Sequence, residues 1–129
     1  MDASRLDGIR LFSGLSKKEL GQLAQHMDEL TVREGEELAT EGRFAHEFFV
    51  IEDGVAEVLQ NGERIAELGP GDFFGEIGLL ETDRRTATVV ATTPLTVIVM
   101  GQREFASMDR DMPEVADRIR AAIRARLSP

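Results

Sequence analysis

Residues 73–89 read FFGEIGLLETDRRTATV, a sequence that does not fit an ordinary β-strand. Two glycines flank a single carboxylate at Glu76, a short apolar turn follows, and Arg85 opens a run with strand-like alternation. Glu76 to Leu80 is about the length of one helical turn, whose first N–H groups lack partners in the helix and suit an anion. The segment therefore predicts a binding site for a negatively charged ligand.

The residue types in this segment favour a ligand with both a phosphate and a sugar. Gly78 has no side chain, so a phosphate can approach the backbone there. Arg85 offers a planar donor fork that suits two phosphate oxygens. Glu76 offers an acceptor for a sugar hydroxyl, which a phosphate-only site would not need. Taken alone, Arg85 could be an ion-paired surface residue, and Glu76 an acid favoured at a helix N-terminus.

The residues around this segment predict strands in the middle of the chain. Asn61-Gly62 tolerates the positive φ angles of a type I′ turn and predicts a tight hairpin. A second break follows at residues 69–72. Many short strands with few helices between them suggest an antiparallel barrel or sandwich. The expected strands lie within residues 30–100 and include 47–51, 55–59, 63–68, 86–91 and 95–100.

Both ends of the chain predict helices. Residues 5–30 are expected to be helical, with a turn at 11–16 and a capping box formed by Ser16 and Glu19. Residues 113–127 are expected to form a final helix that starts at Pro113. Its apolar stripe comprises Val115, Ile119, Ile123 and Leu127.

The stretch from Phe74 to Val89 resembles the phosphate-binding cassette of the cyclic-nucleotide-binding domain family. This family includes the regulatory subunits of cyclic-AMP-dependent kinase, cyclic-nucleotide-gated channels and the bacterial catabolite activator protein. Residues 11–16 resemble the family's N-terminal helical segment, and residues 69–72 resemble the turn before the cassette. The resemblance covers about residues 8–127 and implies an eight-stranded antiparallel β-roll flanked by helices, with a short helix in the cassette.

The resemblance also implies the residue roles. Glu76 would accept from the ribose 2′-hydroxyl, and Arg85 would pair with the exocyclic phosphate oxygens. The backbone N–H groups of Gly78 and Thr86 would complete the phosphate cradle. The predicted ligand contacts are Gly75, Glu76, Ile77, Gly78, Leu79, Arg85, Thr86 and Ala87.

Two features depart from the family pattern. Asp83-Arg84 stands where many members carry a small residue and proline, which makes the loop before Arg85 more charged. The chain has no tyrosine or tryptophan, and no aromatic residue follows Phe105, so an aromatic cap over the base cannot come from the final helix. An aliphatic lid is expected instead, from Ile119, Ala122 or Ile123. We expect the ligand to dock this helix, tethered through residues 108–112.

Composition restricts the function classes. The chain has no cysteine, which excludes disulfides, thiolate metal sites and a cysteine nucleophile. Net charge is −9, with +2 in residues 112–129 and therefore −11 in the first 111, which opposes direct binding to nucleic acid. No third metal ligand is spaced with His26 and His46, so we expect no metal site. The sequence also has no catalytic motif, so we expect no cofactor and no enzymatic activity. An apolar run of membrane-spanning length and a signal peptide are also absent, so a cytoplasmic location is the default.

The sequence is therefore expected to form one domain that senses a purine 3′,5′-cyclic mononucleotide, with cAMP favoured over cGMP. Its helical segments are expected at 1–29 and 102–129, around a β-roll at 30–101 whose cassette spans 74–89. No output segment is recognised, so the expected partner is a separate effector protein or a second copy. The alternative is a barrel scaffold that binds proteins and no nucleotide.

Overall fold

The computed structural model describes the backbone of residues 3–39, 47–74 and 87–127, and their side chains except at 39 and 122–127. The elements are η1 (Ala3–Arg5), η2 (Arg10–Phe12), α1 (Lys17–Ala24), β1 (Asp28–Val32), β2 (Glu37–Ala39), β3 (Glu47–Asp53), β4 (Ala56–Gln60), β5 (Glu63–Leu68), β6 (Phe73–Phe74), β7 (Thr88–Ala91), β8 (Leu95–Gly101), α3 (Gln102–Asp111) and α4 (Pro113–Leu127). The two η elements are single 3₁₀ turns.

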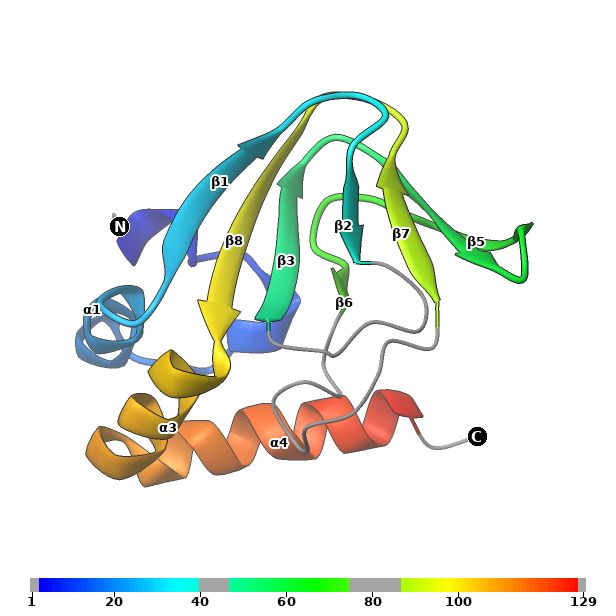
Figure 1. Ribbon diagram of the computed structural model, residues 1–129. Coiled ribbons are helices and arrows are strands. Elements are labelled where there is room, and N and C mark those ends of the chain that lie inside the picture. Colours follow the sequence, from blue (N-terminus) through cyan, green and yellow to red (C-terminus); the bar gives the residue numbers. More distant parts are fainter. Residues whose placement is uncertain (1–2, 40–46, 75–86, 128–129) are drawn as a thin grey trace.

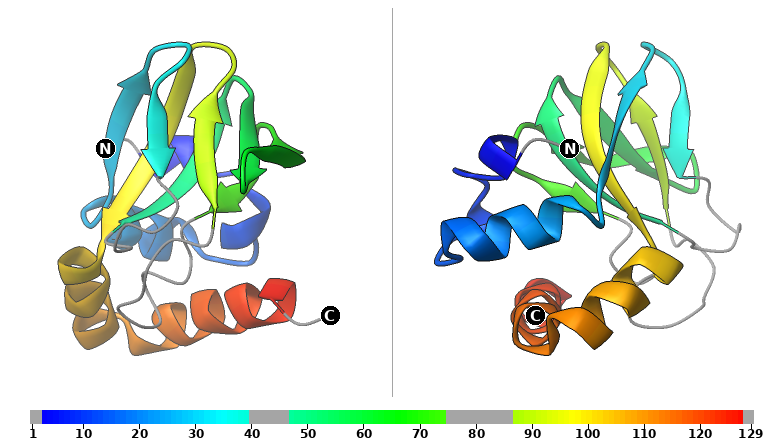
Figure 2. Two further views of the ribbon diagram at one scale, coloured as in Figure 1. Left: turned by 45° about the vertical axis from the view of Figure 1, so that its right-hand side comes forward. Right: turned by 90° about the vertical axis from the view of Figure 1, so that its left-hand side faces the viewer.

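The strands form two antiparallel four-stranded sheets, which confirms the predicted β-roll. One sheet has the order β1-β8-β3-β6 and the other β2-β7-β4-β5 (Figure 1). The helices gather at one side of the roll (Figure 2). The sheet containing β3 is thus covered on both faces, which explains why β3 is buried from Phe48 to Ile51 without polar interruption.

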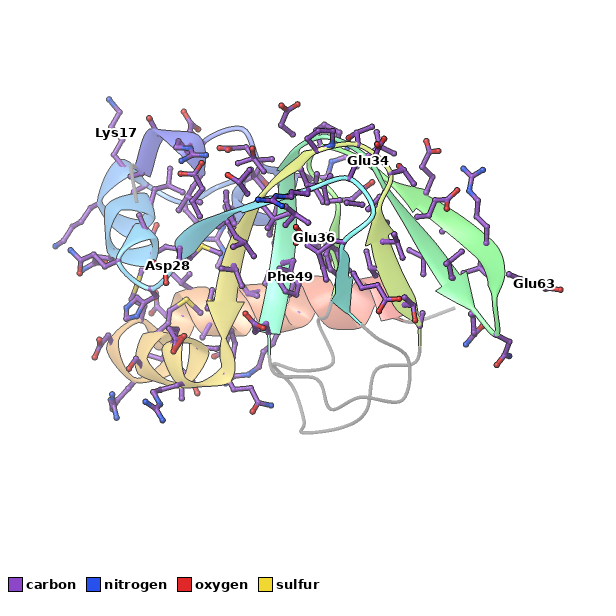
Figure 3. All side chains as sticks on the ribbon, turned by 45° about the horizontal axis from the view of Figure 1, so that its top comes forward. Lys17, Asp28, Glu34, Glu36, Phe49 and Glu63 are labelled. Carbon is purple, nitrogen blue, oxygen red and sulfur yellow. The ribbon has the colours of Figure 1, made fainter. Side chains whose placement is uncertain are left out.

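The buried side chains form two clusters on opposite faces of this sheet. One cluster, the helical core, joins Phe48 and Val50 of β3 to residues of α1, α3 and α4. The other, the roll core, lies between the sheets and contains Phe49 and Ile51 of the same strand (Figure 3 labels Phe49). Because side chains alternate along a strand, β3 supplies both cores. The sheet therefore separates two packed compartments.

The N-terminal helix is shorter than predicted. Ser16 and Glu19 form the expected capping box, with Glu19 N donating to Ser16 Oγ at 3.1 Å and Ser16 N to Glu19 Oε1 at 2.9 Å. The helix ends at Ala24, however, and Asp28–Val32 pairs with β8 instead of extending the helix to residue 30. Backbone pairing with a distant strand therefore overrides the helical pattern here.

Residues 102–111 form a separate helix, so the expected tether at 108–112 is wrong. Met108 belongs to α3 and is fully buried, and only Met112 separates this helix from α4. Phe105 and Met108 stand one helical turn apart and enter the helical core together. The final helix begins at Pro113 and ends at Leu127 as predicted.

The β4–β5 hairpin has the expected turn. Asn61 has φ 53° and Gly62 has φ 81°, the positive values that a type I′ turn requires. Glu57 and Glu67 stand directly opposite on the two strands, and Arg64 offsets their repulsion with contacts to each carboxylate, at 3.6 and 2.8 Å.

Candidate functional site

Most of the predicted ligand contacts lie outside the described residues. Residues 75–86 contain Gly75, Glu76, Ile77, Gly78, Leu79, Arg85 and Thr86, and Ala87 is the one predicted contact that the structure describes. Their segment runs from the end of β6 in one sheet to the start of β7 in the other. The two strand ends therefore define where the segment leaves and rejoins the roll.

The first of these ends is fixed by aromatic packing and by a hydrogen-bonded turn. Phe74 is buried and its ring stacks on Phe49 of β3, with centroids 4.9 Å apart. Before it, Gly71 N donates to Ile51 O at 2.8 Å, and Ile51 N donates to Asp72 O at 2.9 Å. The Asp72 carboxylate also accepts from Gly69 N at 2.8 Å, which confirms the turn at 69–72. The ligand segment, residues 75–86, therefore starts from a packed and hydrogen-bonded edge of the roll.

The second end lies in the middle of the opposite sheet. Strand β7 runs between β2 and β4, with Val89 opposite both Ala39 and Val58. Val89 and Ala91 are buried in the roll core, while Ala87, just before the strand, is half-buried. Pairing on both sides therefore fixes the register of β7 itself.

Apolar side chains line the inner face of the roll. Leu38, Val58 and Val99 pack against the roll core but remain partly exposed. Leu30 pairs with Val97, which faces the roll core, so Leu30 is on the inner face, yet it is 44 % exposed. Val99 is level with Phe74, because both pair with Phe49, and Val58 is opposite Val89 near the start of β7. Leu30 is in the middle of β1, the strand at the opposite edge of the sheet from β6. Their exposed parts give the inner face of the roll an apolar surface that suits a flat ring.

Sequence reasoning missed these four residues as a group. Alternation along a strand shows that its side chains point to two faces, but only the pairing with other strands identifies which face points into the roll.

Among the described residues, no three His, Cys, Asp or Glu side chains gather where they could hold a metal ion. His26 lies beside Asp111, with 3.9 Å between Nε2 and Oδ2, and His46 is outside the described residues.

The first half of α4 is anchored in the helical core. Val115, Ala116 and Ile119 are buried there, so the side chain of Ile119, one of the expected lid residues, belongs to the helical core in this structure. The backbone of Ala122 and Ile123 continues the same helix, and their side chains lie outside the description. Among the described side chains of α4, the buried anchor therefore runs from Val115 to Ile119.

Arg120 clamps this anchored half to α3. Its guanidinium donates to both carboxylate oxygens of Asp109, at 2.7 and 3.1 Å, and to Asp117 at 3.0 Å. It also lies 5.0 Å from the centroid of the Phe105 ring. The hydrogen bond from Arg120 lowers the pKa of Asp109, and the same bond raises the pKa of Arg120. Charge therefore supports the apolar contact between α3 and α4.

We expect the Arg120 clamp to weaken in acid. A carboxyl group whose pKa is lower in the folded state than in the unfolded state stabilises the fold at pH values above its unfolded-state pKa, here 3.8. This stabilisation is lost as the pH falls through the lower pKa of the folded state. Arg120→Gln should therefore reduce the free energy of unfolding at about pH 7 and change it less near pH 2. Urea melts at both pH values measure this difference. Arg110→Gln, on the exposed end of α3, is the control, and an equal loss from Arg120→Gln at both pH values would contradict the clamp.

No helix among the described residues is long and apolar enough to cross a membrane.

Comparison with known proteins agrees with this architecture. A family model described as "Cyclic nucleotide-binding domain" matches residues 29–111. The chain is 37 % identical over 102 residues to a cAMP-dependent protein kinase regulatory subunit of Yarrowia lipolytica, covering 78 % of this chain and 27 % of the relative. It is 31 % identical over 125 residues to that of Schizosaccharomyces pombe, covering 96 % of this chain and 30 % of the relative. The chain thus spans less than a third of the length of these relatives.

Solved structures share the fold over nearly the whole chain. The N-terminal domain of a transcriptional regulator from Streptomyces coelicolor superposes with a TM-score of 0.81 at 27 % identity, covering 98 % of this chain and 90 % of that one. A cyclic nucleotide-binding domain from Methylobacillus flagellatus gives 0.83 at 25 % identity, covering 97 % and 75 %. Three findings point to the same family: a family model that covers most of the chain, two relatives above 30 % identity and the β-roll itself. The chain therefore belongs to the cyclic nucleotide-binding domain family, whose members are regulatory domains.

Proposed function

We propose that this domain binds a purine 3′,5′-cyclic mononucleotide reversibly, cAMP in preference to cGMP, and has no catalytic activity of its own. The observation that carries the proposal is the run from Phe74 to Val89, in which Glu76 and Arg85 are nine positions apart, in a chain of this family. The preference for cAMP is supported by the names of the relatives, which are cAMP-dependent kinase regulatory subunits.

In this proposal, three kinds of protein group contact three parts of the ligand. Arg85 pairs with the exocyclic phosphate oxygens, while the N–H groups of Gly78 and Thr86 donate to the phosphate. Glu76 accepts from the ribose 2′-hydroxyl. The purine lies on the apolar inner face that includes Val58 and Val99. The segment around the ligand is shaped by Gly75, Ile77, Leu79 and Ala87.

Local contacts must supply the affinity, because the acidic body does not attract an anion. The net charge of −11 in the first 111 residues is screened beyond ~8 Å at physiological ionic strength. A pair of opposite charges at ~4 Å is worth about 4 kcal/mol at an effective dielectric constant near 20. Arg85 is the residue that we expect to supply this pair.

The lid in this proposal is the far part of α4. Ala122 and Ile123 follow the anchored half of the helix and are the residues that we expect to close over the base. A lid role for Ile119 would require its side chain to leave the helical core.

A thermal-shift experiment separates ligand binding from the alternative of a scaffold that binds only proteins. With cAMP at about 100 times its dissociation constant, binding would stabilise the fold by about 2.7 kcal/mol and raise Tm by several degrees. Guanosine is an instructive control, because a related regulatory subunit from Trypanosoma cruzi, 27 % identical, was solved bound to guanosine. We expect a smaller shift with guanosine, which gives Arg85 no phosphate. No shift with either cyclic nucleotide would favour the scaffold.

The partner in this proposal is either a separate effector protein or a second copy of the chain. Cyclic nucleotide binding would change the state of the domain, and the partner would respond to that state. We propose no direct contact with nucleic acid or membrane, in keeping with the acidic charge of the body.

Glu76→Gln is expected to weaken cAMP binding by roughly 1–2 kcal/mol, because the amide still accepts a hydrogen bond but without charge assistance. The unmodified chain should also discriminate against 2′-deoxy cAMP, since the carboxylate would lose its donor. Competition titrations with both ligands measure this. Glu81→Gln, five residues along the same segment, is the control. Equal affinity for the ribo and deoxy ligands would remove Glu76 from the sugar site.

A further inference from the structure

The outer face of the β2-β7-β4-β5 sheet, which points away from the roll core, is not covered by any of the described helices. Those helices lie against the other sheet and at the end of the roll where β8 runs into α3 (Figures 1 and 2). An antiparallel sheet with one solvated face normally carries polar residues on that face. A group of aliphatic side chains on it therefore indicates an interaction surface.

A β-bulge in β5 places two neighbouring residues, Arg64 and Ile65, on this outer face. Ala66 pairs with Val58, which packs against the roll core, so Ala66 points inward and Ile65 outward. Arg64 pairs with Leu59, the next residue of β4, so β5 has one extra residue, Ile65, at this point. Ile65 is 55 % exposed, more than any other large apolar side chain in the described part of the chain.

Two further aliphatic side chains adjoin Ile65 on the outer face. Leu59 follows Val58, which packs against the roll core, so Leu59 faces outward. Val90 follows the buried Val89 and also faces outward. Both are partly exposed, and they are diagonal neighbours in the pairing of β4 with β7. Leu59, Ile65 and Val90 therefore form an aliphatic strip across three strands, the outer strip.

Acidic side chains border the outer strip. Glu57 and Glu67 stand opposite each other, and Arg64 contacts both carboxylates, at 3.6 and 2.8 Å. Glu37 stands opposite Val90, on the other side of the strip. Like charges directly opposite each other are destabilising, and one guanidinium does not balance three carboxylates. This face therefore suits a cationic partner and opposes a second copy of itself, which would bring the same carboxylates.

We propose that the outer strip is a docking surface for a protein segment that carries aliphatic side chains flanked by lysine or arginine. The aliphatic side chains would cover Leu59 and Ile65, and the cations would meet Glu57 and Glu67. Burial of the apolar surface supplies affinity, and the charges select against acidic segments. The proposal goes beyond the proposed function, because the outer strip lies on the opposite face of the sheet from the purine and requires no nucleotide.

Peptide titration followed by NMR tests this proposal with a defined probe. The probe is the synthetic peptide KKLVLKK, and the controls are EELVLEE, which reverses the charges, and KKSTSKK, which removes the aliphatic residues. We expect the probe to shift the backbone amide signals of residues 57–67 and 88–91 and to saturate at one peptide per chain. Each control peptide should bind at least about tenfold more weakly.

Substitutions in the chain locate the binding surface. Ile65→Thr keeps a β-branched residue but shortens the aliphatic side chain, and it should weaken binding of the probe about tenfold. Glu67→Lys should have a similar effect. Glu104→Lys, at an exposed position of α3, makes the same change in net charge away from the strip and should bind the probe like the unmodified chain. Val90→Thr replaces Ile65→Thr where the latter does not fold.

Titration with cAMP keeps this proposal apart from the proposed function. We expect Ile65→Thr to bind cAMP as tightly as the unmodified chain does. A chain that binds the probe through Ile65 but binds no cAMP would refute the proposed function and leave the docking surface in place. Equal binding of the probe to Ile65→Thr and to the unmodified chain, or equal binding of EELVLEE, would overturn the proposal. A dimer in sedimentation that Ile65→Thr abolishes would also overturn it, because the occupant would then be a second copy.

Discussion

Arg85→Ala is expected to weaken cAMP binding by roughly 2–4 kcal/mol, the range for removing one partner of a desolvated charge pair. That loss corresponds to about 30-fold to 1,000-fold in dissociation constant. The reason is that the phosphate would keep its desolvation cost without a counter-charge, in a body that carries −11 outside the last helix. Calorimetric titration of the variant measures the change, and its circular dichroism should match the unmodified chain.

Arg84→Ala is the matched control, because it removes the same charge one residue away in the same segment. We expect Arg84 to be solvated, so its loss should change affinity far less than the loss of Arg85. If Arg85→Ala stays within a factor of about three of the unmodified chain, less than 1 kcal/mol, Arg85 is not the phosphate partner.

Gly54→Ala is expected to destabilise the fold by roughly 3–5 kcal/mol, because backbone strain and overpacking act together. Gly54 lies between β3 and β4 with φ 96°, and a Cβ there would stand 2.3 Å from Pro94 O and 2.7 Å from Leu95 Cδ2. The neighbouring turn cannot easily retreat, because Val55 N donates to Thr93 Oγ1 at 2.9 Å and Val55 O accepts from Thr92 N at 3.0 Å. Urea unfolding of the purified variant measures the loss.

Gly62→Ala separates the two causes. Gly62 also has a positive φ, 81°, but apart from its chain neighbours no heavy atom of the described residues lies within 4 Å of the added Cβ. Gly62→Ala should therefore lower the free energy of unfolding only by the cost of backbone strain, about 1–2 kcal/mol. Equal losses in the two variants would show that the close approach to Pro94 contributes nothing.

Local chemistry explains which elements could be predicted from the sequence. The strand at 63–68 matches β5, because the preceding Asn-Gly turn sets its start. The final helix matches α4 at both ends, because Pro113 begins it and the apolar stripe runs through it. The apolar residues Leu20, Leu23, Ala24 and Met27 recur at helical spacing in the sequence and are all buried, although Met27 follows the end of α1.

The errors come from contacts between residues distant in sequence. Asp28–Leu30 belongs to a strand because β8 pairs with it, and a local pattern carries no record of that partner. Likewise, Leu30 and Val99 are assigned to the inner face of the roll only once the register is known. Residues 102–111 are helical, as expected for the segment 102–129, but the sequence did not predict that this helix would continue to Asp111 and be divided from α4 by Met112 alone.

The candidate site was predicted from chemistry rather than from geometry. Glu76 and Arg85 were chosen for what a carboxylate and a guanidinium can bind, and they lie outside the described residues. The structure adds the two strand ends that hold their segment, at Phe74 and Thr88. The residue roles within the segment are predictions, and measurements of ligand binding test them.

Isothermal titration of the chain with cAMP, and then with cGMP under the same conditions, tests the central claim most directly. The account predicts saturable binding of one cAMP per chain, tighter than cGMP, and binding that is strongly weakened in Arg85→Ala. No binding of either cyclic nucleotide at millimolar concentration, where even a free energy of about −4 kcal/mol would give a signal, would contradict it.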